Sequence, residues 1–318
     1  CLAGPPIGAA ESTVSEDPPA APTEVEVAVL VVDIVAIDGA TQAFTADVFT
    51  RFRWTDPRLA EPAGGTRRLS LDKVWHPRLV VANQRNASSK LPEVVEVDAE
   101  GRATYRQRIL GDFSCPLDLA EFPFDQQQLH VQVVSAGYTK EQVKFVIDHE
   151  ESGRSERFSI TDWAVADLEV VEQAYTAPHS ERVVPGVALR FKVDRLARYY
   201  AGTIFATVSI IITMAWLVFW IPPEHINPRI SVSVTSMLSL IAYRFVASQD
   251  LPRLPYLTTM DFFLLGAALM VLLGLAAVVL ISRRQAHGKE ESALRWNKIM
   301  LWSYPLAFGL MLLALMMV

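Results

Sequence analysis

The sequence has few cysteines and lacks the short motifs that mark common enzymes. Two cysteines in 318 residues exclude a disulfide-rich scaffold and a cysteine-based zinc module. No nucleophile elbow, zinc-protease motif, phosphate-binding loop or dinucleotide fingerprint occurs. The six histidines show no metal-ligand spacing. We therefore predict a protein that is not an enzyme and that uses no metal and no other cofactor.

Basic charge is scarce as well. The formal net charge is −6, which argues against a nucleic-acid partner. Residues 1–196 carry a net −10, whereas residues 197–318 carry +4 and include three uncharged runs, 199–221, 262–282 and 299–318. A helix needs about 20 apolar residues to cross a lipid bilayer. These runs predict three membrane-spanning helices, and buried helices of a large soluble core are the alternative.

A fourth helix-length segment, residues 226–249, is more polar and carries Arg229 and Arg244. Its many hydroxyl side chains would suit a helix with one side in water inside the membrane. At steps of three and four residues, one face of this helix is polar at one end and apolar beyond it. The residues of this candidate pore face are Ser231, Thr235, Leu238, Ala242, Phe245 and Gln249. A polar interface between helices is the alternative.

The loop between the last two spans is basic, so we expect it to be cytoplasmic. The N-terminal part and the C-terminus are then outside, and we expect that a leader for export has been removed. Residues 1–23 read as a flexible tail, and residues 24–196 contain short β-rich runs broken by turns. The predicted fold is an all-β, immunoglobulin-like sandwich (24–196) followed by an all-α bundle (197–318). Its four helices are expected at about 199–221, 226–249, 258–282 and 296–318.

The segment 115–129 contains Phe122, Pro123, Phe124 and Asp125 followed by glutamine, and it resembles the signature loop of Cys-loop receptors, the pentameric ligand-gated ion channels. Trp75–Pro77, Arg195 with Tyr199–Tyr200, and Leu251–Tyr256 also resemble segments of that family. Cys115 occupies the first cysteine position of the loop, but Leu129 occupies the second, so no bridge can form. This departure is typical of prokaryotic members, and the chain looks similar to the Erwinia-type bacterial channels.

The resemblance implies a homopentamer in the cell inner membrane, with a periplasmic N-terminal domain and a small-molecule agonist of unknown identity. Leu238 and Phe245 are expected to form the closed gate, because an apolar constriction dewets. Glu224, Asn227 and Asp250 are the candidates for selectivity, and we expect permeant cations. Against this, Asn227 is neutral and Arg229 is basic; packing outside the lumen and contact with lipid headgroups are the alternatives for Arg229.

For coupling, we expect Asp125 to pair with Arg195 while Phe122 and Phe124 press on the linker after the pore helix. The linker residues concerned are Pro252, Pro255 and Tyr256. The alternative is that the two phenylalanines are core residues and Asp125 caps a turn.

In the family the agonist binds between subunits in an aromatic pocket. The candidate walls are Tyr138, Trp163 and Tyr175, with Phe52 from the neighbouring subunit. An amine, a carboxylate or protons all stay open as the agonist, and His76 or His130 could sense pH. The alternative function is a membrane-anchored extracellular binding or sensor protein that does not conduct ions.

Overall fold

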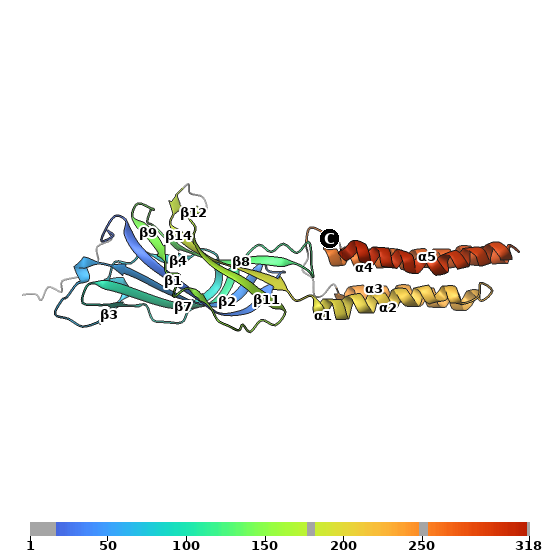
Figure 1. The fold of residues 1–318 in the computed structure, drawn as a ribbon, viewed down its shortest axis with the longest axis horizontal. Helices are drawn as coiled ribbons and strands as arrows, with labels where there is room; N and C mark the ends of the chain where they lie inside the picture. The colour runs from blue at the N-terminus through green and yellow to red at the C-terminus, as the bar shows by residue number, and fades with distance from the viewer. Residues whose placement is uncertain (1–16, 177–181, 248–253, 317–318) are drawn as a thin grey trace, which may run out of the picture. The chain divides into compact units, whose positions relative to one another are not determined.

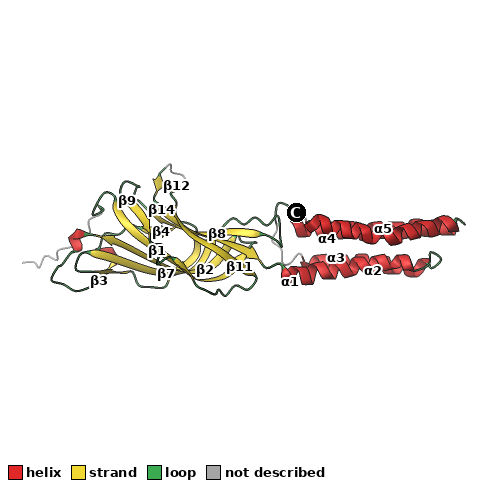
Figure 2. Cartoon of the chain, viewed as in Figure 1, coloured by secondary structure: helices red, strands yellow, loops and turns green. Residues whose placement is uncertain are grey.

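The computed structural model describes residues 17–176, 182–247 and 254–316. It divides the chain into two compact units. The first holds the described residues up to Leu117, with 128–161 and 165–193; the second holds 118–127, 162–164 and the described residues from Asp194 onward. The strands form the body of the first unit, and the helices that of the second (Figures 1 and 2). The two units are described separately below.

The first unit consists of two sheets and a small hairpin. The larger sheet contains β1 (Thr23–Asp38), β2 (Ala43–Thr55), β3 (Arg67–Ser70), β5 (Gln84–Ser89), β6 (Val94–Val97), β7 (Arg102–Ser114), β9 (Val143–Ile147) and β10 (Gly153–Arg154). Its strands run in the order β10-β1-β2-β7-β6-β3, with β9 also on β1 and β5 also on β7. The smaller sheet has the order β11 (Trp163–Glu172), β14 (Gly186–Arg195), β8 (Gln126–Ser135), β4 (Leu79–Val81). The hairpin pairs β12 (Tyr175–Thr176) with β13 (Val183–Val184), and single 3₁₀ turns lie at η1 (Pro57–Leu59) and η2 (Leu71–Lys73).

Aromatic side chains join the two sheets into a sandwich. Phe44 of β2 stacks on Phe113 of β7 at 5.4 Å between ring centroids, and meets Phe191 of β14 edge-on at 5.5 Å. Alternating β-branched residues of β1, such as Val25 and Val27, are fully buried. Period-two patterns place one face of a strand in the core, which is why the β-rich runs of the sequence become the long strands.

The second unit contains the helices. They are α1 (Arg198–Tyr200), the π-helical turn η3 (Ala201–Phe205), α2 (Ala206–Leu217), the 3₁₀ turn η4 (Val218–Trp220), α3 (Ile226–Ala247), α4 (Thr259–Ala286) and α5 (Glu290–Met316). Within the described residues, Gly202–Trp220 and Thr259–Ala286 are long and apolar enough to cross a membrane by length and composition. Thr258 begins α4 with a capping box, in which its hydroxyl and the Asp261 carboxylate each bind the other residue's backbone N–H.

Two helices extend beyond their predicted bounds. α4 continues to Ala286 rather than residue 282, and α5 begins at Glu290 rather than residue 296. Counting apolar residues finds only the part of a helix suited to lipid, whereas charged residues such as Arg283 and Glu290 are good helix formers outside it. The chain turns at Gly288, whose φ of +73° lies in the left-handed region that favours glycine.

Candidate functional site: the α3 face and the Asp125–Arg195 cluster

The predicted pore face lies on the side of α3 that the other helices of the chain leave uncovered. Ser231, Thr235 and Ala242 are exposed, and the larger apolar residues Leu238 and Phe245 are 61% and 71% exposed. The Thr235 hydroxyl donates to the Ser231 carbonyl at 2.8 Å, so both lie along one line of the helix. Gln249, the last residue of the predicted face, lies outside the described residues.

The opposite side of α3 packs into the helical unit. Arg229, Ser233, Ser236 and Leu240 recur at helical spacing and are all buried. Arg229 is fully buried, donates to Asn297 of α5 at 2.5 Å, and lies 5.9 Å from the Phe219 ring centre. Asn297 in turn donates to the Phe219 carbonyl at 2.8 Å. Of the alternatives raised for Arg229, the structure has packing inside the chain rather than contact with headgroups.

The polar residues at the start of α3 are accessible. Glu224 and Asn227 are both exposed, whereas the basic side chain of Arg229 points into the bundle. Glu224 is therefore the acidic group in the described part of the α2–α3 connection. Asp250, the candidate for the other end of the helix, lies outside the described residues.

Asp125 and Arg195 form a two-point ion pair within the helical unit. The Arg195 Nε donates to one carboxylate oxygen at 2.6 Å and its second guanidinium nitrogen donates to the other at 3.1 Å. Both side chains are buried, at 1% and 9% exposed, and Gln127 donates to Asp125 at 2.7 Å. Paired N–H···O bonds of this kind fix orientation as well as charge.

Aromatic rings surround the Arg195 guanidinium. Its central carbon lies 4.1 Å from the Trp163 ring centre, 4.8 Å from that of Phe122 and 5.9 Å from that of Tyr200. Such contacts stabilise a cation that is removed from water. Trp163 therefore belongs to this cluster, and its assignment to an agonist pocket between subunits stays a prediction. Sequence reasoning missed it because Trp163 begins a strand far from both charged residues along the chain.

The two phenylalanines of the signature loop contact the start of the first helix. Phe122 is buried against Tyr200 at 4.9 Å, and Phe124, which is half exposed, lies 6.0 Å from Phe205. The expected contact of these two rings with the linker stays a prediction, because part of the linker lies outside the described residues.

Other parts of the loop contact the linker and α4. The Tyr256 hydroxyl accepts the backbone N–H of Leu119 at 3.1 Å. The backbone carbonyls of Ala120 and Phe122 accept the N–H groups of Thr259 and Met260. Pro255 is exposed, and Pro252 lies outside the described residues. The loop is thus joined to the helices by backbone hydrogen bonds, which no side-chain pattern could reveal.

The other aromatic candidates are distributed over the β unit. Phe52 is buried and stacks on Tyr105 at 6.5 Å, whereas Tyr138 accepts a hydrogen bond from the Trp75 indole at 3.0 Å. Tyr175 lies in the short β12–β13 hairpin. Phe52 is expected to come from the neighbouring subunit, so the aromatic pocket stays a prediction.

Cys115 is a buried thiol that forms no disulfide bond. Leu129, which occupies the second cysteine position of the signature loop, is fully buried. Its sulfur lies 3.3 Å from the Gln128 carbonyl and 3.7 Å from the His130 ring. Burial raises the pKa of the thiol, so it stays protonated at neutral pH. Among the described residues, no group of three or more His, Cys, Asp or Glu side chains could hold a metal ion.

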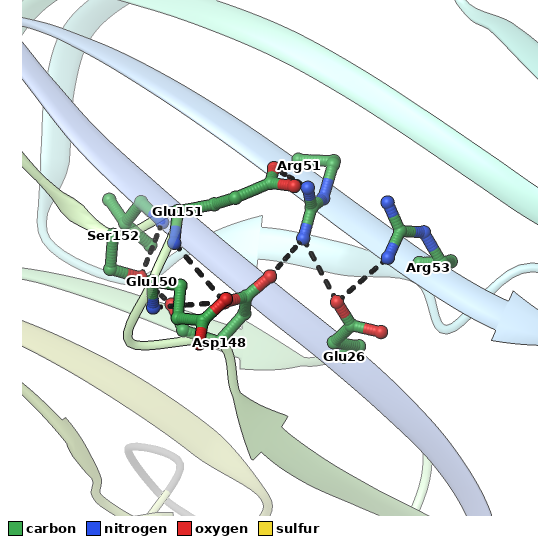
Figure 3. A network of polar contacts seen from close by, with 8 residues as sticks. Glu26, Arg51, Arg53, Asp148, Glu150, Glu151 and Ser152 are labelled. Atoms are coloured by element: carbon green, nitrogen blue, oxygen red, sulfur yellow. Dashed lines mark hydrogen bonds and ion pairs between the residues drawn. The ribbon is translucent and has the colours of Figure 1, made fainter.

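A network of charged side chains lies on β1, β2 and the turn after β9 (Figure 3). Arg51 is buried and donates to Glu26 at 2.9 Å and to Asp148 at 2.5 Å, and it also pairs with Glu151. Arg53 shares Glu26 at 2.9 Å. Burial raises the pKa of Asp148, but hydrogen bonds, chiefly from Arg51, outweigh it and hold that pKa below its ordinary value.

Replacing Arg51 with glutamine is expected to destabilise the β unit by about 3 kcal/mol at pH 7, because Asp148 and Glu151 then lose their cation and Glu26 keeps only Arg53. In the unmodified protein, the stability due to Asp148 is present above its unfolded pKa of about 3.9 and is lost as pH falls through the depressed folded pKa. The variant should lose this acid dependence. Thermal unfolding at pH 7 and in acid measures both, with the exposed pair partner Arg106→Gln as a control costing under about 1 kcal/mol.

Comparison with known proteins agrees with this geometry. Residues 13–197 match the neurotransmitter-gated ion-channel ligand-binding domain, and residues 203–306 match the neurotransmitter-gated ion-channel transmembrane region. The chain is 26% identical over 270 residues to the glycine receptor subunit beta of rat and of human, which covers 81% of this chain but 54% of the receptor subunit. The chain thus spans about half the length of these relatives. It is also 23% identical over 254 residues to a proton-gated ion channel of Gloeobacter violaceus, covering 78% of this chain and 70% of that protein.

Both matched domains are parts of channels rather than enzymes, as the missing catalytic motifs predict. They also confirm a ligand-binding β domain followed by a helical transmembrane region. The resemblance carried by the signature loop is therefore confirmed, and the chain belongs to the neurotransmitter-gated ion-channel family.

Proposed function

We propose that this chain is the subunit of a homopentameric, cation-selective ion channel in the cell inner membrane. Five α3 helices surround the pore, and ligand or acid acting on the β domain opens it. The observation that carries the proposal is the division of α3 into a buried face and an exposed face. The exposed face is lined by hydroxyls near its start and by Leu238 and Phe245 farther along. Hydroxyl side chains followed by large apolar side chains on one exposed helix face are typical of a helix that lines a water-filled pore with an apolar constriction.

Current through the purified protein in planar bilayers tests the proposal. We expect ligand- or acid-evoked single-channel steps whose reversal potential in a salt gradient follows the cation. A folded, membrane-inserted protein that passes no current under a broad screen of amines, carboxylates and pH would instead support a non-conducting sensor.

Glu224 is proposed to contribute the selectivity at the inner mouth. A carboxylate 4 Å from an ion in water is worth about 1 kcal/mol, which is about fivefold in occupancy. We therefore expect Glu224→Gln to lower the cation-to-anion permeability ratio by about fivefold. Reversal potentials in a sodium chloride gradient measure it, and Glu291→Gln, an exposed acid on α5, serves as the matched control. An unchanged ratio in Glu224→Gln would place selectivity elsewhere.

Acid sensing is proposed to involve the two partly buried histidines. Burial, and then the nearby Arg78, lowers the pKa of His76, while Glu93 partly opposes them. Burial and Arg190 lower the pKa of His130, which also lies beside Cys115. Both imidazoles are therefore neutral at pH 7, and acidification below their lowered pKa values places charges where the fold disfavours them. Protons thereby favour any conformation in which these rings are better hydrated.

The Asp125–Arg195 pair is proposed to connect β-domain changes to the helices. Asp125 directly precedes β8 and Arg195 ends β14, and both strands belong to one sheet. The same pair belongs to the compact unit that holds the helices. A rearrangement of that sheet is therefore transmitted along the chain itself to the start of α1, and through the backbone hydrogen bonds of the signature loop to the start of α4.

A further inference from the structure

The first membrane helix is not a regular α-helix along its whole length. Residues Ala201–Phe205 form the π-helical turn η3 between α1 and α2. In a π turn the backbone N–H groups bond five residues back instead of four, so the regular pairing of N–H and carbonyl groups is displaced. Most of this turn belongs to the apolar segment Gly202–Trp220. An unsatisfied backbone group is costly in lipid, so neighbouring helices and hydroxyl side chains have to complete the pairing.

Two hydroxyl groups donate to one carbonyl of this turn. The Thr207 hydroxyl, from the same helix, donates to the Thr203 carbonyl at 2.5 Å. The Tyr243 hydroxyl, from α3, donates to the same carbonyl at 3.0 Å. Tyr243 follows the buried Leu240 at helical spacing, on the side of α3 opposite its exposed face. The far end of α3 is thus hydrogen-bonded to the π turn of the first helix.

The π turn connects the Arg195 cluster to the body of the bundle. Tyr200, directly before the turn, packs on Phe122 at 4.9 Å and lies 5.9 Å from the Arg195 guanidinium. Phe205, the last residue of the turn, lies 4.6 Å from Phe263 of α4. A change of the turn from π to α would rotate the residues before it by one helical position, about 100°, and shift them by about 1.5 Å. Tyr200 would then leave Phe122.

We propose that this π turn is a two-state switch of the first helix and that Tyr243 is the positioning residue that holds it in the π form. The inference rests on the proposed function, since it concerns how the pore opens. In the π form, Tyr243 draws its end of α3 toward the first helix and carries Phe245 away from the pore axis, which favours conduction. In the α form, the Tyr243 hydroxyl is released, Tyr200 leaves Phe122 and the pore closes. The β domain and the pore thereby bias one element with two packings.

The carbonyl signal of Thr203 in nuclear magnetic resonance tests the hydrogen bond directly. Thr203–Ile204 is the only Thr–Ile pair in the sequence, so carbon labels on threonine carbonyls and nitrogen labels on isoleucine amides select a single carbonyl. In the full-length protein in lipid bilayers, we expect Tyr243→Phe to move this signal upfield, because hydrogen bonding deshields a carbonyl carbon. Tyr304→Phe is the matched control. It removes a buried hydroxyl that has no hydrogen-bond partner in the described part of the chain, and should leave the signal in place.

Bilayer currents of the same variants, with acid as the probe, test the gating role. Tyr243→Phe should need at least about fivefold more protons for half-maximal activation, as expected for the loss of one hydrogen bond that favours the conducting state. Tyr304→Phe should activate like the unmodified protein. Tyr243→Phe removes only a hydroxyl, so a merely structural role of the ring would move neither the carbonyl signal nor the activation.

An unchanged Thr203 signal in Tyr243→Phe would overturn the proposal, because the hydroxyl would not hold the turn. Unchanged activation, or activation by less acid, would overturn the gating role assigned to Tyr243. Absence of acid-evoked current in the unmodified protein contradicts acid opening, which belongs to the proposed function alone. The Thr203 signal is measured without conduction, so it still decides whether Tyr243 holds the turn.

Discussion

Replacing Arg195 with glutamine is expected to abolish ligand- or acid-evoked current and to lower the free energy of unfolding by about 3–5 kcal/mol. The variant leaves the Asp125 carboxylate buried with only the Gln127 amide and backbone groups near it. It also removes the cation from between the rings of Trp163 and Phe122. An uncompensated buried charge is among the largest single-residue penalties known in folded proteins.

Two companion variants separate gating from folding. Arg195→Lys keeps the charge but cannot make two parallel bonds or lie flat on Trp163, so we expect a folded protein with weakened activation. Arg198→Gln removes an exposed arginine three residues away and should change neither property. Thermal unfolding in detergent and bilayer currents are the two measurements. Normal gating in Arg195→Gln would remove the proposed coupling role, even if the protein were less stable.

The sandwich and the uncovered face of α3 were both open to prediction because each rests on a local period. Residues two apart share a strand face and residues three or four apart share a helix face, so Val25 with Val27, or Ser231 with Thr235, need no tertiary information. The pairing of Asp125 with Arg195 was suggested by the signature loop, whose sequence is specific.

The remaining contacts of the candidate site could not be predicted from the periodicity of the sequence, because they join residues that are distant along the chain. Trp163 joins Arg195 only because β11 and β14 are neighbours in the smaller sheet, and Phe124 lies by Phe205 because of the path of the loop. Arg229 lowers the mean hydropathy of its segment, but hydropathy does not indicate that its side chain points into the helical bundle toward Asn297.

Replacing Leu238 with serine is expected to produce a resting leak and to shift activation to lower ligand concentration or weaker acid, by at least about tenfold. Leu238 is 61% exposed on the uncovered face of α3, so in a closed pentamer five such side chains would meet around the axis. Withdrawing a leucine side chain from water is worth about 1.5–3 kcal/mol, and about 1.4 kcal/mol is a factor of ten in an equilibrium. Serine removes that preference for the dry, closed state and lets water remain in the constriction.

Position on the helix, rather than polarity alone, must account for the effect. Leu273→Ser places the same hydroxyl on an exposed leucine of α4, and we expect no leak from it. Leu240→Ser changes a buried residue on the opposite face of α3, so it should lower thermal stability without raising resting current. Resting and evoked currents of the three variants, normalised to protein inserted in the bilayer, decide the matter. If Leu238→Ser resembles Leu273→Ser, the gate does not lie at Leu238, and Phe245, 71% exposed two turns farther along the same face, becomes the position to test.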